Sequence, residues 1–270
     1  MIDGGLCSQM HQFMLGQIIK DCGQNVEYDL SFYKRGLDLD GNPTRFFLLH
    51  KLFPDICIRQ ANRIKINLYK HCFFHHGKYP EQEDTSWYNV KAPVYLGGYY
   101  SDIKQMIMSG GIFTYIFKLD KNILSPVMKK VCYNIIQTQS VGVHIRRGDL
   151  KDYNITYGNP VTLDYIQNSI SYFSKELNNP VFYFFSDDKD YIEKEVIHTI
   201  GDIKYWVSDR DYQNVYEDFI LLSYCKGVIT SKGTMGKYAA LYGNAKTIVL
   251  SADDRQIDIV KYLNCNKKII

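Results

Sequence analysis

The sequence predicts an α/β protein whose second half contains a mostly parallel sheet. Between residues 140 and 250, apolar runs typical of strands alternate repeatedly with stretches typical of helices. Three of these predicted strands end in polar clusters, which a parallel sheet brings together along one edge. The chain of 270 residues is 46% hydrophobic, so it can bury a sizeable core.

The first predicted helix covers about Ser8–Asp21. Apolar side chains recur there at helical spacing, namely Met10, Phe13, Met14 and Ile18. The turn before this helix contains Gly4 and Gly5, which let the backbone approach a ligand closely. Very little chain precedes Asp3, so the strand expected before this turn is very short, or the sequence begins late in it.

The pattern of the following segment predicts short strands and helices. We expect strands at residues 26–32 and 94–100 and helices at residues 102–110 and 120–138. His71 and His75 are spaced like two zinc ligands on one helix. No third ligand is obvious, so we interpret this histidine-rich region as a structural patch.

A predicted strand at residues 140–145 leads directly into two arginines. Its apolar residues alternate with other residues, as in a strand, and Arg146-Arg147-Gly148-Asp149 follows it. Guanidinium groups match phosphate oxygens in fork geometry, so this edge predicts a pocket for a phosphorylated ligand. The alternative is a solvated sheet edge without a ligand.

The remaining elements extend the same pattern to the end of the chain. Strands are expected at residues 180–185, 203–207, 228–230 and 246–250, and helices at residues 162–177, 189–200, 218–226 and 235–241. The domain boundary is expected near residues 137–140, which gives an N-terminal domain of residues 1–138 and a C-terminal domain of residues 139–270.

Chemistry suggests a role for each polar cluster. Arg146 and Arg147 suit a diphosphate, whose developing charge must be neutralised when it leaves. The loop Ser231-Lys232-Gly233-Thr234 begins a helix, so its backbone amides suit phosphate oxygens. Asp187 or Asp188 could accept hydrogen bonds from a guanine edge, or could instead cap the next helix. Asp149 is the candidate for activating a hydroxyl.

Composition excludes several classes of protein. With 32 basic and 29 acidic residues, the net charge of +3 does not indicate a nucleic-acid binder. The seven cysteines are scattered and include no Cys-x-x-Cys pair, which favours a reducing compartment. The sequence predicts neither a signal peptide nor a membrane-spanning stretch, so we expect at most peripheral membrane association.

These motifs together resemble glycosyltransferase family 11, the α-1,2-fucosyltransferases. His144-Ile145-Arg146-Arg147-Gly148-Asp149 is similar to the His-x-Arg-Arg-Gly-Asp signature of that family, and the stretch from Gly4 through Gln9 resembles its N-terminal Gly-Gly-Leu-Gly-Asn-Gln. Further similar blocks follow in family order, namely Gly97–Tyr100, Leu163–Tyr165, Phe185–Asp188 and Leu222–Lys226.

The resemblance implies a GT-B-type fold, with two Rossmann-like domains facing a cleft. It implies an inverting, metal-independent transferase that needs no cofactor and moves L-fucose from GDP-β-L-fucose to a galactoside hydroxyl. Arg146 would be the main diphosphate contact, with His144 and one of Asp187 and Asp188 near the guanine. Gly4, Gly5, Ser8 and Gln9 would line the acceptor side.

The same resemblance gives expectations about the setting of the reaction. The acceptor would be an oligosaccharide or a lipid-linked glycan, and the protein would be a cytoplasmic bacterial enzyme of surface polysaccharide synthesis, such as O-antigen. It would associate at most peripherally with the inner face of the inner membrane.

Two departures from the family pattern keep other functions open. Cys7-Ser8 replaces Gly-Asn, and the last loop reads Ser231-Lys232-Gly233-Thr234-Met235-Gly236-Lys237 where the family has Asn-Ser-Ser-Phe-Ser-Trp-Trp. The second departure places two lysines beside the expected phosphate site. A transferase for another nucleotide sugar and a non-catalytic nucleotide- or glycan-binding protein on a transferase fold are therefore the alternatives.

Overall fold

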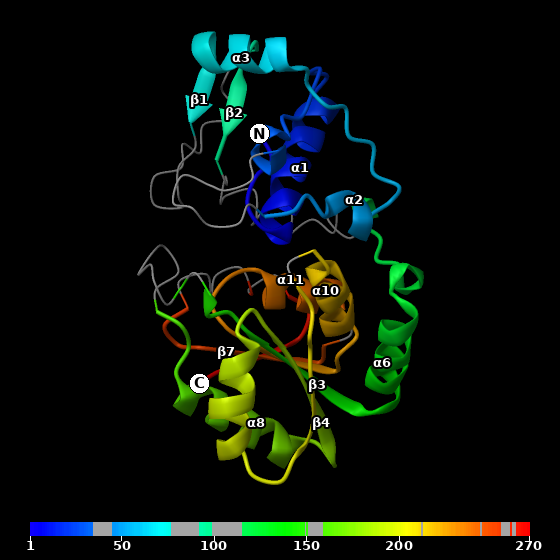
Figure 1. Ribbon diagram of the computed structural model, residues 1–270, viewed down its shortest axis with the longest axis vertical. Coiled ribbons are helices and arrows are strands. Elements are labelled where there is room, and N and C mark those ends of the chain that lie inside the picture. The colour runs from blue at the N-terminus through cyan, green and yellow to red at the C-terminus, as the bar shows by residue number, and fades with distance from the viewer. Residues whose placement is uncertain are drawn as a thin grey trace. The chain divides into compact units, whose positions relative to one another are not determined.

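The computed structural model divides into two compact units, Met1–Lys118 and Leu119–Ile270 (Figure 1). It describes residues 1–34, 45–76, 92–98, 115–148, 150, 159–211, 213–243, 245–254, 260 and 263–270. The units divide earlier in the chain than the boundary predicted at residues 138 and 139. The reason is that helix α6 (Pro126–Gln137) packs against the sheet and helices of the second unit.

The second unit is built on a six-stranded sheet in which every strand runs parallel to its neighbours. The strand order is β5-β4-β3-β6-β7-β8. The strands are β3 (Gln139–Ile145), β4 (Pro180–Ser186), β5 (Lys204–Val207), β6 (Gly227–Thr230), β7 (Thr247–Leu250) and β8 (Asn266–Ile269). The prediction of a parallel sheet is therefore confirmed.

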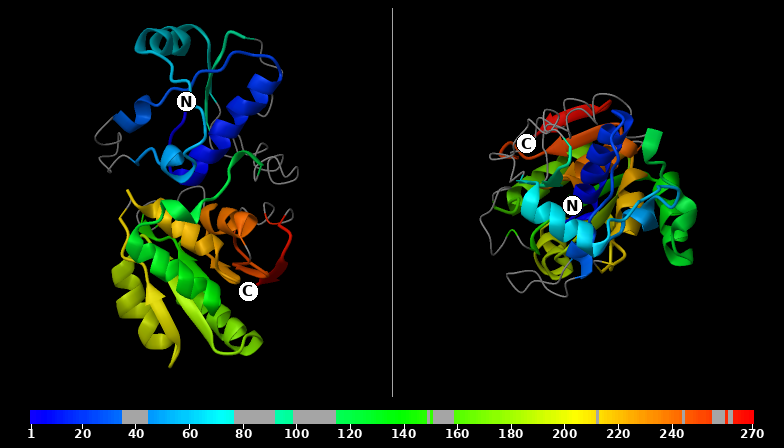
Figure 2. Two further views of the ribbon diagram at one scale, coloured as in Figure 1. Left: turned by 90° about the vertical axis from the view of Figure 1, so that its right-hand side faces the viewer. Right: turned by 90° about the horizontal axis from the view of Figure 1, so that it is seen from above.

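Helices cover both faces of this sheet (Figure 2). On one face lies α8 (Leu163–Glu176), whose predicted N-cap Thr162 accepts a hydrogen bond from the Tyr165 amide at 3.2 Å. The other face carries α10 (Val215–Ser223) and α11 (Met235–Tyr242). At Gly142 of β3, an added Cβ would lie 2.3 Å from Leu222 Cδ1, so α10 approaches this strand as closely as glycine allows.

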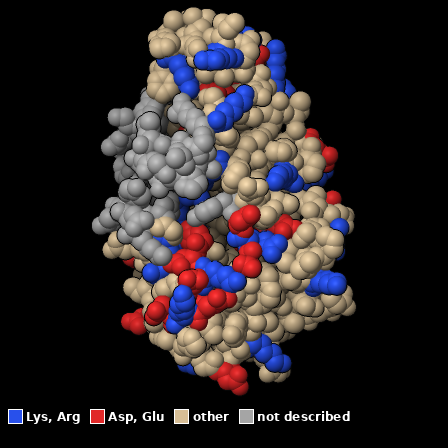
Figure 3. Space-filling view, in the orientation of Figure 1, with Lys and Arg blue, Asp and Glu red and all other residues tan. Residues whose placement is uncertain are grey.

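Charged side chains of both signs are interspersed on the face of the second unit shown in Figure 3. Lys194 and Asp190 form an exposed pair at 2.9 Å, and Lys189 lies 3.1 Å from Asp209. Exposed pairs of this kind add little to stability. The stability of this unit therefore depends mainly on its core.

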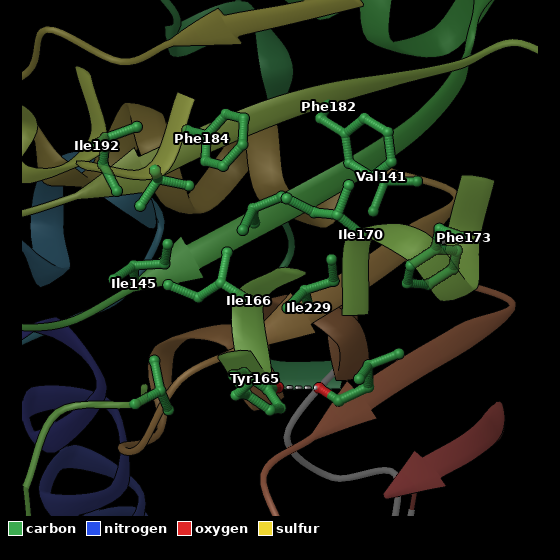
Figure 4. Packing of buried hydrophobic residues seen from close by; sticks show 14 residues of the cluster. Val141, Ile145, Tyr165, Ile166, Ile170, Phe173, Phe182, Phe184, Ile192 and Ile229 are labelled. Atoms are coloured by element: carbon green, nitrogen blue, oxygen red, sulfur yellow. Dashed lines mark hydrogen bonds between the residues drawn. The ribbon is translucent and has the colours of Figure 1, made fainter. Parts of the chain in front are cut away.

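The core lies between the sheet and α8 (Figure 4). Val141, Val143 and Ile145 point to this face, since alternate residues of a strand share a side. The buried Tyr165 hydroxyl donates to the carbonyls of Thr230 at 2.8 Å and Val249 at 3.1 Å. The core helix thereby holds the carboxyl ends of β6 and β7.

The chain builds the sheet outward from β3 in two directions. After β3 it passes through α8 to β4, and then through helical turns that begin with α9 (Lys189–Tyr191) to the edge strand β5. It returns through α10 to β6, which lies on the opposite side of β3. The strand order thus reverses between β3 and β6, and open parallel sheets bind ligands in the crevice at such a switch point.

One strand of the sheet was not predicted. β8 has the sequence Asn-Lys-Lys-Ile and is exposed along its length at the edge of the sheet. A strand of this kind lacks the apolar run by which the inner strands are recognised. Its pairing with β7 depends on the position of the backbone and not on burial of its side chains.

The first unit contains shorter elements around α1 (Leu6–Asp21), which confirms the first predicted helix. The others are a helical turn at Ser31–Lys34, α2 (Leu49–Leu52), α3 (Arg63–Cys72) and a parallel pair formed by β1 (Phe74–His76) and β2 (Tyr95–Gly97). Among the described residues, no helix is long and apolar enough to cross a membrane.

In this unit one prediction is wrong, the alternative of two zinc ligands on one helix is excluded, and one prediction lies outside the described residues. The strand expected at residues 26–32 is reduced to a bridge between Tyr28 and Gln60. His71 lies in α3 whereas His75 lies in β1, so the two do not share a helix face. The helix expected at residues 102–110 falls outside the described part of the chain.

A buried carboxylate organises the inside of the first unit. Asp29 accepts hydrogen bonds from the Tyr95 hydroxyl and from the Ser31 amide at 2.8 Å, and Lys70 Nζ lies 3.2 Å from it. Burial raises the pKa of Asp29, but these donors and the lysine charge outweigh it and bring the pKa down to about 2. Asp29 thus joins α3, through Lys70, to β2.

Candidate active site at the carboxyl edge of the sheet

The candidate site lies at the switch point between β3 and β6. The backbone amide of Ser231 donates to the His144 carbonyl at 2.9 Å, and the Arg146 amide donates to Ser231 Oγ at the same distance. Ser231 is almost completely buried. The two strands therefore stay joined beyond their last paired residues, as the predicted convergence of the polar clusters requires.

The His144 side chain lies beside these hydrogen bonds between the ends of β3 and β6. Its side chain is buried, and Nδ1 is 3.4 Å from Ser231 Oγ. Burial, with the positive charges of Arg146 and Lys237, lowers the pKa of His144 to about 3. The imidazole is therefore neutral at physiological pH, so His144 can position a ligand by hydrogen bonds but adds no charge.

The Arg146 side chain packs against Gly233 of the neighbouring loop. Gly233 has φ of +103°, and a Cβ added there would lie 3.3 Å from Arg146 Nη1. Only glycine adopts this conformation readily and leaves room for the guanidinium. Because α11 begins just beyond, at Met235, the guanidinium and the start of a helix lie together.

Arg147 turns away from this loop towards β4. Its amide donates to Asp187 at 2.8 Å and its Nε to Asp188 at 3.3 Å. Its guanidinium carbon is 3.5 Å from the centre of the Tyr191 ring, a cation–π contact. The two arginines therefore diverge, and Arg146 is the one beside the Ser231 loop.

Asp188 behaves as a helix cap, the alternative that the sequence left open. Its carboxylate accepts from the Tyr191 amide at 3.2 Å and from Arg147, and its own amide donates to Ser186 Oγ at 3.0 Å. Asp187 is exposed and also faces the Arg147 backbone. Both aspartates thus shape the Arg147 turn.

The two lysines of the unusual loop have acidic partners. Lys237 is fully buried, pairs with Asp254 and donates to the Gly233 carbonyl at 2.6 Å. Lys232 is also buried, and its Nζ lies 2.5 Å from Asp253. The segment after β7 therefore supplies the counter-charges that hold this loop in place.

The sequence analysis did not single out two further buried acidic residues, Glu217 and Asp218, at the start of α10. Ser208, just after β5, donates to Asp218 at 2.6 Å, and Arg210 lies 3.5 Å from Glu217. Burial raises the pKa of Asp218 to about 7, although Ser208 and Arg210 lower it. In sequence the Glu-Asp pair looks like ordinary acids in the first turn of a helix, so no signal marked it.

The predicted N-terminal residues occupy different environments within the first unit. Gly4 has φ of +71°, Gly5 is the N-cap of α1, and Ser8 lies in its first turn, partly exposed. Gln9 is completely buried: it donates to Phe46 O at 2.8 Å and to Gly4 O, and accepts from two amides after Phe46. Gln9 therefore has a structural role.

Asp149, the predicted base, lies outside the described residues.

The second unit is thus a Rossmann-like α/β domain with a cation and a helix-start loop at its switch point. Within the described residues, no three His, Cys, Asp or Glu side chains are grouped in a way that could hold a metal ion. These features define a class of domain, and comparison with known proteins gives the family.

Residues 57–260 match the model of glycosyl transferase family 11, and the chain belongs to this family. An Escherichia coli α-1,2-colitosyltransferase is 30% identical over 231 residues, which are 75% of this chain and 73% of that protein. A Bos taurus galactoside 2-alpha-L-fucosyltransferase is 29% identical over 113 residues, 41% of this chain. The human galactoside alpha-(1,2)-fucosyltransferase 1 is 28% identical over 113 residues. The chain spans only 30% and 31% of the length of these two mammalian relatives.

Replacement of Lys237 by Met should destabilise the protein strongly, because it removes the cation facing the buried Asp254. Breaking a buried ion pair in this way costs about 3–5 kcal/mol. Urea unfolding measures the loss, and Lys237→Met/Asp254→Asn should recover much of it. Lys232→Met is the matched control, with a loss of about 1 kcal/mol, because its partner Asp253 is exposed. Equal stability of Lys237→Met and the wild type would contradict this account.

Asp218 should make the protein less stable as pH rises from about 4 through 7. The folded state keeps a proton on Asp218 up to about pH 7, whereas the unfolded chain loses it near pH 3.8. Folding therefore gains from the protonated form at low pH and loses that gain as pH rises. Asp218→Asn, which still accepts from Ser208, should remove this part of the pH dependence. Urea midpoints at pH 5 and pH 8 test it, and identical pH slopes in the two proteins would refute it.

Proposed function

We propose that this protein is an inverting glycosyltransferase that moves L-fucose from GDP-β-L-fucose to a galactoside hydroxyl in α-1,2 linkage. The observation that carries the proposal is the position of Arg146 at the switch point. Its amide donates to Ser231 Oγ and its guanidinium lies against Gly233. A cation next to the start of a helix suits a diphosphate. Membership of glycosyl transferase family 11 and the activities after which the relatives are named support the chemistry.

In the proposed reaction, the acceptor oxygen attacks the anomeric carbon from the side opposite the diphosphate. The bond from that carbon to the diphosphate oxygen breaks, so the configuration inverts and GDP leaves with the bonding electrons. Arg146 and the amides at the start of α11 stabilise the developing negative charge. Asp149 takes the proton of the acceptor hydroxyl. No metal or cofactor has a role in this scheme.

Donor recognition divides between the two sides of the switch point. Neutral His144 can exchange a hydrogen bond with the nucleoside, and exposed Asp187 has the acceptor oxygens that a guanine edge needs. Arg147 and Asp188 act as positioning residues in this proposal, because each holds the other and Tyr191. Lys232 and Thr234 border the diphosphate loop and contribute through their backbone.

The wider assignment follows the family pattern. We place the donor with the second unit, residues 119–270, and the acceptor with the first unit, residues 1–118, including Gly4, Gly5 and Ser8, in a GT-B-type arrangement. The acceptor is an oligosaccharide or a lipid-linked glycan of a bacterial surface polysaccharide such as O-antigen. The reaction then takes place in the cytoplasm.

A second donor is favoured by one comparison. The Escherichia coli relative matches three quarters of this chain and is named a colitosyltransferase. Colitose is the 3-deoxy analogue of L-fucose, so a site for it has no 3-hydroxyl to bind. Relative kcat/KM for the two GDP-linked sugars decides between them, because a site built to bind a hydroxyl strongly rejects an analogue lacking it.

Arg146→Ala should lower kcat/KM for transfer by at least about a hundredfold, since removing one preorganised donor to a developing charge has this effect. The assay measures transfer of labelled sugar from GDP-fucose and from GDP-colitose to a soluble galactoside. Arg59→Ala, at an exposed arginine of the first unit, is the matched control and should keep full activity.

Three outcomes separate the hypotheses. Unchanged turnover of folded Arg146→Ala would remove Arg146 from the mechanism. Transfer only from a UDP-linked sugar would overturn the guanosine donor. If the wild type binds GDP but transfers no sugar, the protein is a binding module on a transferase fold.

A further inference from the structure

Helix α3 leaves an apolar stripe exposed on the first unit. Ile64 is 80% exposed and Leu68 is 52% exposed. They lie four residues apart and so share one face of the helix, which Cys72 continues. Phe73 and Phe74 follow the helix directly in sequence and are also exposed. Large apolar side chains gathered in this way mark an interaction surface.

Positive charge borders this stripe. Arg63 and Lys65 flank Ile64, and both are exposed. Between Ile56 and Pro80 the sequence has five Lys and Arg residues and three His residues but no Asp or Glu: Arg59, Arg63, Lys65, Lys70, His71, His75, His76 and Lys78. In Figure 3, basic side chains lie beside uncharged ones where α3 forms the surface.

Acidic groups from elsewhere offset only part of this charge. Glu27 lies 3.1 Å from Arg59 and 2.9 Å from Lys65, and Asp29 pairs with Lys70. Four cations at Arg59, Arg63, Lys65 and Lys70 thus face two carboxylates, which leaves a local charge of 4 − 2 = +2. The surface is therefore both apolar and positively charged.

We propose that this α3 surface, formed by Ile64, Leu68, Phe73 and Phe74 with Arg63 and Lys65, docks the protein on an anionic lipid bilayer. A helix with an apolar face and flanking cations lies in the plane of the membrane interface, with its apolar side chains among the acyl chains. Each nearby Lys or Arg adds attraction to anionic headgroups. The inference extends the proposed function, because a lipid-linked acceptor is presented at such a surface.

A second copy of the chain is a poorer occupant. A twofold dimer uses the same patch on both subunits, so it would bring the cations of one α3 surface against those of the other. An anionic membrane reverses that repulsion and accepts the apolar stripe as well. Charge complementarity therefore favours lipid.

Sedimentation with vesicles tests the proposal. The wild type should bind vesicles containing phosphatidylglycerol, bind much less to pure phosphatidylcholine, and be released by salt. Ile64→Ser/Leu68→Ser should weaken binding by at least about tenfold, since two apolar side chains no longer enter the bilayer. The matched control is Val127→Ser/Tyr133→Ser on α6, where both residues are about as exposed, and it should bind like the wild type.

The opposite results would overturn the proposal. They are unchanged binding of Ile64→Ser/Leu68→Ser, equal loss in the α6 control, or no binding of the wild type to phosphatidylglycerol. A wild-type dimer that the α3 variant converts to a monomer would assign the surface to a second copy. Transfer to a soluble galactoside, assayed in parallel, keeps the two proposals apart. The α3 variant should retain that activity, and loss of transfer with normal vesicle binding would count against the donor site alone.

Discussion

The hydrogen bonds of Ser231 to the backbone of His144 and Arg146, at the end of β3, are the interaction on which the candidate site depends. They hold the ends of β3 and β6 together where the strand order reverses, which is where open parallel sheets bind ligands. Because Gly233 has no side chain, the Arg146 guanidinium can lie directly against the loop that follows β6. In the proposed function, a diphosphate site built this way is ready before the ligand arrives, which is how an enzyme stabilises developing charge without reorganising itself.

Buried charge maintains this preorganisation. A lysine as completely buried as Lys237 pays a large desolvation cost, and its pairing with Asp254 offsets that cost only in good geometry. Its second bond, to the Gly233 carbonyl, fixes the loop that faces Arg146. Burial is the main reason that the pKa of His144 is low, and the charges of Arg146 and Lys237 lower it further. The Lys237–Asp254 pair thus holds the loop and also adds to the low pKa of the neighbouring His144.

Much of the second unit could be predicted because its signals are local. The apolar runs of the inner strands and the Thr162 cap are read from a few neighbouring residues, and parallel order follows from the alternation of strands and helices. The divergence of Arg146 and Arg147 could not be predicted, since it depends on contacts of Arg147 with Asp188 and Tyr191, which lie in the turn and helix after β4. The pairing of Lys232 and Lys237 with Asp253 and Asp254 joins segments far apart in sequence, and β8 has no apolar pattern at all. Non-local contacts account for these failures.

The most direct measurement is a crystal structure of the complex with GDP. The diphosphate should lie at the carboxyl ends of β3 and β6, with its oxygens within hydrogen-bond distance of the Arg146 guanidinium and of backbone amides between Ser231 and Met235. A diphosphate bound elsewhere, or an Arg146 side chain turned away from a bound nucleotide, would contradict the account.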